Sequence, residues 1–512
     1  MSFPWLSLIV MAPLIAAAFL LFIPSSSKGT FRVVAAASTV VSLIGSIVVA
    51  LSYDLEAGGL QFRETLPVLP ALGIRYDLAV DGWGVALLLL TGIIIFAGAF
   101  ATWNLEDRGK EFYILLLTLV AGVFGVFVSL DLFIFFLFYE IAVLPMYLLI
   151  GIWGSSKAVP TGGPLGFAMR RLDVGGREYA AMKLTLMLLI GSAFILVGIL
   201  ALYEDAGLNS FSLLDLARAD IPVSTQMWVF PALWLGFGTL AGVFPFHTWS
   251  PDGHASAPTA VSMLHAGVLM KLGAFGVMRV GMVLCPDAAV AWSGVVGAVA
   301  VINIVYGALG AMSQTDLKYI VAYSSVSHMG VVMLGAATLS VDGWNGAIFQ
   351  MFAHGLMTGL LFALVGLLYG RAHDREIFNM GGFAGVMPGI AVFFTIAGLS
   401  SLGMPGFAGF VAEFLVFLGA WSSGHPVWAV AGIVGAWLTA VYVLRAVRAI
   451  FWGEGPPAHY HELSDARGVE CVALVTLGLC IILFGSIPRL VLEPIDVGTT
   501  QHLNALLLET AP

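Results

Sequence analysis

Long apolar runs separated by short polar segments occupy almost the whole chain of 512 residues. A helix needs about 20 apolar residues to cross the hydrocarbon core of a bilayer. The pattern therefore predicts an all-α polytopic membrane protein with about 14 transmembrane helices and no water-soluble domain. The predicted helices cover residues 4–23, 31–52, 78–103, 112–129, 131–153, 178–203, 226–246, 258–284, 288–312, 318–339, 344–370, 387–421, 427–451 and 469–490.

Two of these predicted helices contain helix-breaking residues. The seventh runs into VFPFHTWSPDGH (243–254), and the twelfth contains LSSLGMPGFAG (399–409). Proline removes a backbone donor and glycine loosens the helix, so both segments should unwind locally. Two breaks five helices apart predict two inverted five-helix repeats, each with one broken helix, as in many ion transporters.

This repeat divides the chain into four parts. Helices 1–3 fall in residues 1–110, and the first antiporter-like repeat, helices 4–8, falls in residues 111–285. The second, inverted repeat (helices 9–13) covers residues 286–452. The last helix and the C-terminal tail cover residues 453–512.

The basic residues sort to opposite sides of the predicted helices. Because loops on the cytoplasmic side are enriched in Lys and Arg, the sorting favours an even number of spans with both termini periplasmic. The cytoplasmic set is Lys28, Arg32, Arg108, Lys110, Lys157, Arg170, Arg171, Arg177, Lys183, Lys318, Arg371, Arg375, Arg445, Arg448 and Arg467. The opposite set is Arg63, Arg75, Arg218, Arg279 and Arg489.

Composition supports the membrane assignment and argues against nucleic-acid binding and against a redox centre on this chain. Hydrophobic residues make up 60% of the chain and charged residues 10%, whereas a soluble domain carries about 25% charged residues. No basic cluster indicates nucleic-acid binding. The three cysteines form no CxxC pair and the histidines show no metal or haem spacing, so any redox centre is expected on another protein.

Three ionisable residues lie near the centres of predicted spans: Glu140, Lys271 and Glu413. A charge at that depth costs several kcal/mol, by contested estimates from roughly 3 upward, so it needs a partner, water or a function. Together they suggest a route for a proton. For each residue a structural ion pair or hydrogen bond is the alternative, and Glu413 could instead cap amides freed at the break.

Several histidines extend this candidate route. His328, His354 and His265 are intramembrane imidazoles, each able to take a proton at one ring nitrogen and release it from the other. Each could equally be a hydrogen-bonded packing residue. His247 and His254 stand at the break of the seventh helix, where a water-filled cavity would reach them.

The remaining charges near the cytoplasmic ends have a simpler interpretation. Lys183 is expected at the membrane interface, with a place in a proton relay as the alternative. Arg171, Lys318 and the 371–376 cluster are expected to be solvated anchors.

Three motifs carry a specific resemblance: FPFHTWSPDGHASAPTA (244–260), QTDLKYIVAYSSVSHMG (314–330) and QMFAHGL (350–356). They resemble the antiporter-like membrane subunits of respiratory complex I, and the similarity extends from about residue 75 to 450. Within that group the chain is most similar to the chain M (chain 4) family of NADH-quinone oxidoreductase. Glu413 supports this choice, since chains L and N usually have Lys on the broken twelfth helix.

The resemblance implies a proton-translocating subunit of a complex I-like NADH-quinone oxidoreductase in a bacterial inner (cytoplasmic) membrane. Glu140 would be the fifth-helix glutamate, Lys271 the central lysine and Glu413 the exit-side acid. His328 and His354 would line the polar axis. NADH, FMN, iron–sulfur clusters and quinone are expected on partner subunits, with none on this chain. Chain L-like and chain N-like neighbours are expected beside it.

One departure from the family pattern affects these expectations. The family's seventh helix usually has a lysine seven residues before the motif histidine, but Leu240 stands there. Glu140 could therefore be neutral at rest, or pair with Lys183 or another subunit. His265 is more typical of chain L and of Mrp-type subunits. Two other functions stay open: a subunit of a Mrp-type cation/proton antiporter or membrane-bound hydrogenase, and a scaffold copy that no longer pumps.

Overall fold

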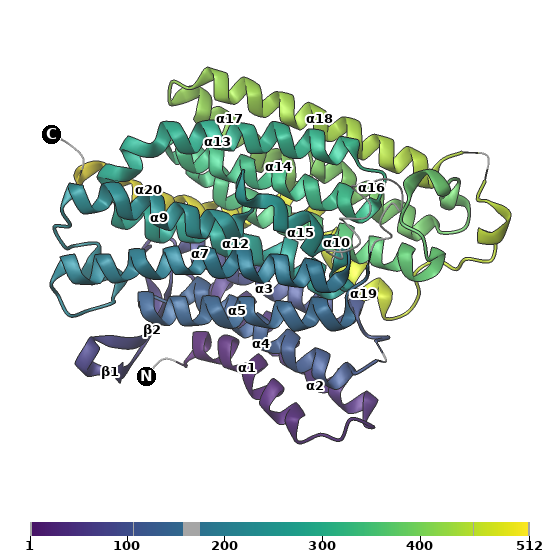
Figure 1. Ribbon diagram of the computed structural model, residues 1–512, viewed down its shortest axis with the longest axis horizontal. Helices are drawn as coiled ribbons and strands as arrows, with labels where there is room; N and C mark the ends of the chain where they lie inside the picture. Colours follow the sequence, from purple (N-terminus) through teal and green to yellow (C-terminus); the bar gives the residue numbers. More distant parts are fainter. Residues whose placement is uncertain (1–2, 106, 157–174, 454, 510–512) are drawn as a thin grey trace, which may run out of the picture.

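The protein is a bundle of long helices that lie side by side with their axes along the longest dimension of the molecule (Figure 1). The structure is a computed structural model that describes residues 3–105, 107–156, 175–453 and 455–509. Lys157, Arg170 and Arg171 lie outside these residues.

The helices follow one another with short connections. They are α1 (Trp5–Leu21), α2 (Lys28–Ser52), α3 (Gly82–Ala101), α4 (Gly109–Val128), α5 (Leu132–Trp153), α7 (Arg177–Ala206), α8 (Leu213–Leu216), α9 (Val223–Ala241), α10 (Trp249–Ser256), α11 (Thr259–Leu264), α12 (Met270–Gly276), α13 (Pro286–Ser313), α14 (Leu317–Ala337), α15 (Val341–Ala372), α16 (Pro388–Ser401), α17 (Ala408–Ser422), α18 (Pro426–Phe451), α19 (Glu470–Ser486) and α20 (Arg489–Glu509). Several of them are capped at the N-terminus by a short aspartate or serine side chain that accepts hydrogen bonds from backbone amides of the first turn. These N-cap residues are Asp81, Asp131, Asp316 and Ser340.

The described residues contain 11 helices long and apolar enough to cross a membrane, or up to 12 if the bent α19–α20 pair forms one span. Three further apolar helices, α1, α16 and α17, are shorter than that criterion. The multi-span helical architecture is therefore as predicted, and the number of long spans is smaller than 14.

Both predicted helix breaks are present. The chain leaves α9 through Gly242, whose φ of 75° suits glycine, and passes Pro245 before α10 begins. The second break separates α16 from α17, with Gly403 and Gly406 at φ 69° and 95°. Buried Asn303 of α13 stabilises the first break, because its Oδ1 accepts the Phe244 amide at 2.8 Å while its Nδ2 donates to Val326 of α14 at 2.8 Å.

The segment between the first break and α13 is the most deeply enclosed part of the bundle. All of the residues in the most apolar window of Thr259–Met282 are buried. Two π-helical turns, η3 (His265–Leu269) and η4 (Val277–Met282), flank α12 on either side. Wide π turns of this kind are rare and frequently occur at functional sites.

An antiparallel hairpin corrects the all-helical prediction. Strands β1 (Gln61–Leu69) and β2 (Ile74–Val80) pair between α2 and α3, and Arg63 contacts Asp77 across them at 2.7 Å. The predicted third helix begins at residue 78, which lies inside β2, because the apolar run continues unbroken from the strand into α3.

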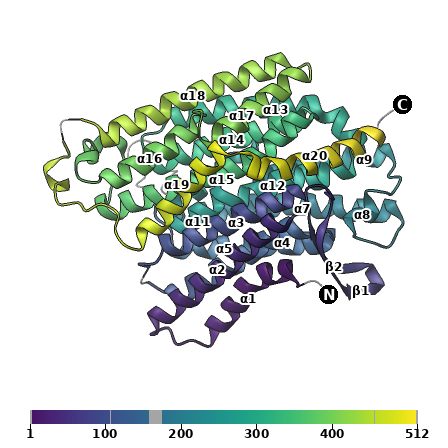
Figure 2. The same cartoon turned by 180° about the vertical axis from the view of Figure 1, so that it is seen from behind.

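The two ends of the bundle carry different polar contacts. At one end lie the hairpin, the start of α1 and the end of α20 (left in Figure 1, right in Figure 2). The side chains of Arg63, Arg75 and Arg279 all make their contacts there, with Asp77, Asp215 and Asp81. Arg177, Arg371 and Arg375 contact residues of the opposite end. The sorting of these basic residues into two sets thus follows the two ends.

A buried charge cluster attaches the C-terminal helix α20, which crosses α3 and α15 in Figure 2. Asp81 accepts hydrogen bonds from Arg279 and from His502 of α20, and Trp83 donates to Thr499 at 2.9 Å. Burial alone would raise the pKa of Asp81, but the Arg279 guanidinium and His502 hold it well below its usual range.

We expect Asp81→Asn to destabilise the protein by about 3–5 kcal/mol, because Arg279 would keep a buried charge without its partner. The thermal midpoint of the purified protein should fall, and limited proteolysis should cut α20 faster. Glu56→Gln, at an exposed glutamate of the same end, is the matched control. Because the folded-state pKa of Asp81 is lowered, its stabilisation should persist above about pH 4 and be lost below it. Equal midpoints for the two variants would contradict the cluster's role.

Candidate functional site

Lys271 is fully buried on α12, at the centre of the bundle. Its Nζ donates to the backbone carbonyl of Ala266, in the preceding π turn, and lies 2.6 Å from Nδ1 of His354 on α15. The wide turn supplies a carbonyl and the neighbouring helix supplies an imidazole. Lys271 is thus held by two polar partners inside an apolar core.

His354 connects Lys271 to His328 on α14. The two imidazole rings lie 5.2 Å apart, centroid to centroid. Nδ1 of His328 lies 3.1 Å from Gln350 Nε2 and 3.4 Å from Glu413 Oε1, and its Nε2 lies 3.2 Å from Ser401 Oγ. Each ring nitrogen of His328 therefore has its own partner, which is the arrangement a proton-transferring imidazole needs.

Glu413 ends this row on α17, within two turns of the second break. It is 6% exposed and pairs with His328. No backbone amide of the described residues bonds to its carboxylate, so the geometry favours the buried pair over amide capping. A hollow of about 410 Å³ between α17 and α18 reaches Glu413 and is otherwise lined by apolar side chains and glycine.

We call Lys271, His354, His328 and Glu413 the polar row. Four segments of the chain, α12, α15, α14 and α17, bring these residues together. Three of the four predicted spans that hold them, 318–339, 344–370 and 387–421, are consecutive, and one span separates them from the fourth, 258–284. The structure therefore places two imidazoles between Lys271 and Glu413, in ring contact with each other, while Nε2 of His354 has no hydrogen-bond partner in the described protein.

A second imidazole cluster lies near Lys271. His254 and His265 pack with ring centroids 4.0 Å apart, and Trp249 stacks on His265 at 5.0 Å. Both ring nitrogens of His265 and Nδ1 of His254 are buried without a hydrogen-bond partner in the described protein. Buried polar atoms are usually satisfied by protein or by ordered water, so this cluster suits hydration.

His247 lies apart from that pair. It is buried in the break between α9 and α10, against Phe244 and Tyr306, and its Nδ1 also lacks a partner in the described protein. Within the described residues, no hydrogen bond or ring contact joins it to the polar row, so its predicted role in proton transfer stays a prediction.

Lys183 forms a second polar group at the end of the bundle opposite the hairpin. Its Nζ contacts Asp252 Oδ2 at 2.8 Å, and Tyr319 donates to Asp252 Oδ1 at 3.0 Å. Both charged side chains are 25% exposed, so solvent reaches them. The structure therefore pairs Lys183 with Asp252 and not with Glu140.

The expectation that Lys318 and the 371–376 cluster are solvated anchors is wrong. Lys318 is 4% exposed and donates to the Ala257 carbonyl, just after α10, at 2.7 Å. Arg375 contacts Asp316 at 3.3 Å, and Arg371 contacts Glu470 at 2.6 Å. Lys318 and Arg375 thus bind carbonyls at the end of α10, and Arg371 binds the segment that leads into α19, contacts that their positions near helix ends did not indicate. Arg171 lies outside the described residues.

Glu140 is not brought to the polar row. It is half-buried on α5, between the exposed apolar residues Leu137 and Leu144. Its Oε1 lacks a hydrogen-bond partner in the described protein, and Ser192 of α7 is the polar side chain within reach. Leu240, where the family places a lysine, is fully buried against Gly273 of α12.

Three further members of these polar groups, Gln350, Ser401 and Asp252, were not predicted from the sequence. Gln350 precedes His354 by four residues and so lies on the same helix face, a spacing that could have found it. Ser401 and Asp252 each flank a break, which is the corresponding signal for them.

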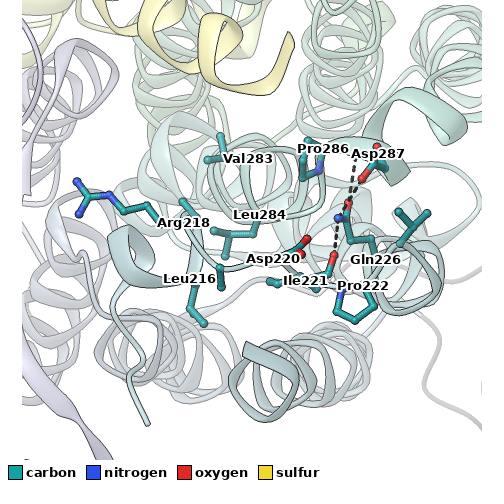
Figure 3. A pocket seen from close by; sticks show the side chains of 13 residues that line it. Leu216, Arg218, Asp220, Ile221, Pro222, Gln226, Val283, Leu284, Pro286 and Asp287 are labelled. Carbon is teal, nitrogen blue, oxygen red and sulfur yellow. Dashed lines mark hydrogen bonds between the residues drawn. The ribbon is translucent and has the colours of Figure 1, made fainter. Parts of the chain in front are cut away.

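The described residues hold no group of three or more His, Cys, Asp or Glu side chains arranged to bind a metal. A separate hollow of about 300 Å³ lies between residues 216–226 and 283–287 (Figure 3). There Gln226 binds the Ile221 carbonyl and Asp287. None of the candidate residues lines it.

Residues 129–439 match the family described as NADH:quinone oxidoreductase/Mrp antiporter, transmembrane. A protein of Thermosynechococcus vestitus named NAD(P)H-quinone oxidoreductase chain 4 2 is 37% identical over 99% of this chain and 93% of its own length. Chain 4 3 of a Picosynechococcus species is 38% identical over 98% and 94%.

Two solved structures share the fold. One chain of respiratory complex I from Thermus thermophilus with bound NADH superposes with a TM-score of 0.86, at 28% identity, over 97% of this chain and 99% of its own. A chain of the Mrp complex from a Dietzia species gives 0.85 at 22% identity, over 99% and 100%, which shows likeness of fold alone.

A double-mutant cycle tests the partner of Lys183. Lys183→Met and Asp252→Asn should show a coupling of about 0.2–1 kcal/mol in the unfolding free energy, as expected for a partly exposed ion pair. Lys183→Met with Glu140→Gln should be additive. A coupling confined to the second pair would contradict the geometry.

Proposed function

This chain belongs to the NADH:quinone oxidoreductase/Mrp antiporter transmembrane family, and we propose that it translocates protons as a subunit of a complex I-like NADH-quinone oxidoreductase. Its relatives are antiporter-like membrane subunits of the chain 4 type. NADH, FMN, the iron–sulfur clusters and quinone would all reside on partner subunits, so this chain would move protons while electrons pass elsewhere.

The observation that carries the proposal is the polar row. Lys271, His354, His328 and Glu413 form a series of close contacts through the buried centre of an apolar bundle. A proton on Lys271 would pass to His354, then through water at the unpartnered Nε2 of His354 to His328, and leave from Glu413 toward the side that holds the hairpin and the termini. Serine and glutamine flank His328 and would orient it.

Proton uptake would occur at the opposite end of the bundle. Asp252, with Lys183 and Tyr319, lies where solvent reaches charged groups, on the half-helix that resumes after the first break. The next turns of the chain hold His254 and His265, whose unpartnered nitrogens suit a hydrated connection to Lys271. His247 would stand beside this route.

Coupling to electron transfer would be electrostatic or conformational. Two unit charges about 4 Å apart interact by about 4 kcal/mol at an effective dielectric of 20, so moving one charge can transfer a proton to its neighbour. The α12 helix is suited to respond, since the π turns on both sides can change register.

The finer architecture completes the proposal. Counting α1, the α16–α17 pair and the bent α19–α20 pair as one span each brings eleven spans to fourteen. The two breaks would then occupy equivalent places in inverted repeats at 111–285 and 286–452. With both termini periplasmic, the end that holds Lys183 and Lys318 would face the cytoplasm of a bacterial inner membrane.

Glu140 would act at a boundary with another subunit. Its half-buried side chain lies beside the exposed Leu137 and Leu144 of α5, its Oε1 is buried without a partner in the described protein, and the buried Leu240 supplies no cation from α9. Chain L-like and chain N-like subunits are the expected neighbours, and one of them would meet Glu140 there.

A Mrp-type cation/proton antiporter or a membrane-bound hydrogenase subunit is the second candidate, favoured by His265 and by the shared fold. The two assignments differ in the transported ion. Transport by the purified complex that requires sodium would favour the antiporter, whereas NADH-dependent proton uptake without sodium would favour the oxidoreductase.

We expect Lys271→Met to abolish proton movement through this subunit, because the buried amine is the centre of the row. The complex should still assemble and oxidise NADH. The measurement is the proton-to-electron ratio in proteoliposomes, with Lys110→Met, at a lysine on the bundle surface, as the control. An unchanged ratio in Lys271→Met would remove this lysine from the path.

Glu140→Gln separates a working subunit from a scaffold copy. The amide keeps the shape of the side chain but cannot carry the charge, so a working channel should lose pumping rate. The same proteoliposome assay measures it. If Glu140→Gln and Lys271→Met both pump normally, the scaffold alternative is correct.

A further inference from the structure

The outer face of α18 is an unbroken apolar stripe. Helix α18 lies at the edge of the bundle in both views (Figures 1 and 2). Its exposed side chains recur every three or four residues and so share one face. They are Val430, Val434, Trp437, Val441 and Leu444.

Arg448 continues this stripe by one more step of four residues, in the last turn of the span. No hydrogen bond or ion pair to a described residue engages its side chain. Its neighbour Arg445 points inward instead and donates to the carbonyls of Met312 and Gln314 at 2.6 and 2.7 Å. One guanidinium therefore fixes the end of α18, and the other is not held by any of the described residues.

Arg448 borders a hollow of about 660 Å³ at this end of the bundle. Phe378 and Trp452 stand at its rim, each 65% exposed. The described lining contains two arginines and no acid, namely Phe378, Met380, Gly381, Arg445, Arg448, Ala449, Trp452 and Gly453.

We propose that this hollow binds the headgroup phosphate of an anionic phospholipid. Arg448 would pair with the phosphate, since a guanidinium matches phosphate oxygens with two parallel N–H donors. Trp452 and Phe378 would lie at headgroup level, where aromatic side chains are enriched.

The length of the stripe fits the acyl chains. One leaflet of the hydrocarbon core is about 15 Å deep, half of a core about 30 Å thick. At about 1.5 Å per residue, that depth corresponds to about ten residues of α18. The acyl chains would thus cover Leu444, Val441 and Trp437, which are exposed and apolar.

A transmembrane helix of another subunit fits this face less well. It would have to end at the same level and present a carboxylate to Arg448. A phospholipid has both parts in one molecule, and basic pockets at the cytoplasmic end of transmembrane helices bind such headgroups.

The test compares phosphatidylglycerol binding to the delipidated complex by native mass spectrometry. Arg448→Gln should weaken it about fivefold, since a basic residue at the membrane surface contributes about 1 kcal/mol. Trp452→Leu should weaken it as well and leaves both arginines intact. Arg467→Gln, at an exposed arginine of the same end outside the hollow, should bind like the wild type.

Three results would overturn the proposal. One is equal binding by Arg448→Gln and Arg467→Gln in complexes of identical subunit content. Another is loss of a neighbouring subunit from Arg448→Gln with its lipid content unchanged, which would assign the face to a protein. A third is competition by inorganic phosphate as effective as that by phosphatidylglycerol, which would make it a general anion site.

Discussion

The contact between Lys271 and His354 is the interaction on which the rest of the structure depends. An amine sealed in an apolar core needs hydrogen-bond acceptors, and here a backbone carbonyl and an imidazole supply them. The carbonyl is offered by a π turn and the imidazole by α15. Of these two groups, the imidazole of His354 is also the one that would accept a proton from Lys271 in the proposed path.

The irregular segments of the bundle follow from that requirement. Unwound backbone inside a membrane must be covered by protein, and Asn303 covers the first break by bonding both to the loop and to α14. The second break brings Ser401 and Glu413 to opposite sides of His328. Each break thus lies beside buried polar side chains, Asn303 at the first break and Ser401 with Glu413 at the second.

The sequence was informative wherever a single residue was anomalous in its own helix. Lys271, Glu413, His328 and His354 stand out in apolar runs, and proline with glycine located both breaks. Contacts between helices could not be predicted in this way. The spacing of residues assigns a side chain to one face of its own helix, but it does not identify the helix that packs against that face. Lys318 was misjudged for this reason, since its position near a helix end did not reveal that α10 covers it. Strand β2 was predicted as the start of the third helix because the apolar run continues through it. Of the three alternatives for Glu140, pairing with Lys183 is wrong, since Lys183 pairs with Asp252.

A high-resolution electron-density map of the intact complex tests the central claim most directly. It should show Lys271 Nζ in contact with His354, His328 between His354 and Glu413, and ordered water on the unpartnered nitrogens of His265. Lys271 and Glu413 separated by dry apolar side chains, with no water at the histidines, would contradict a proton path through this bundle.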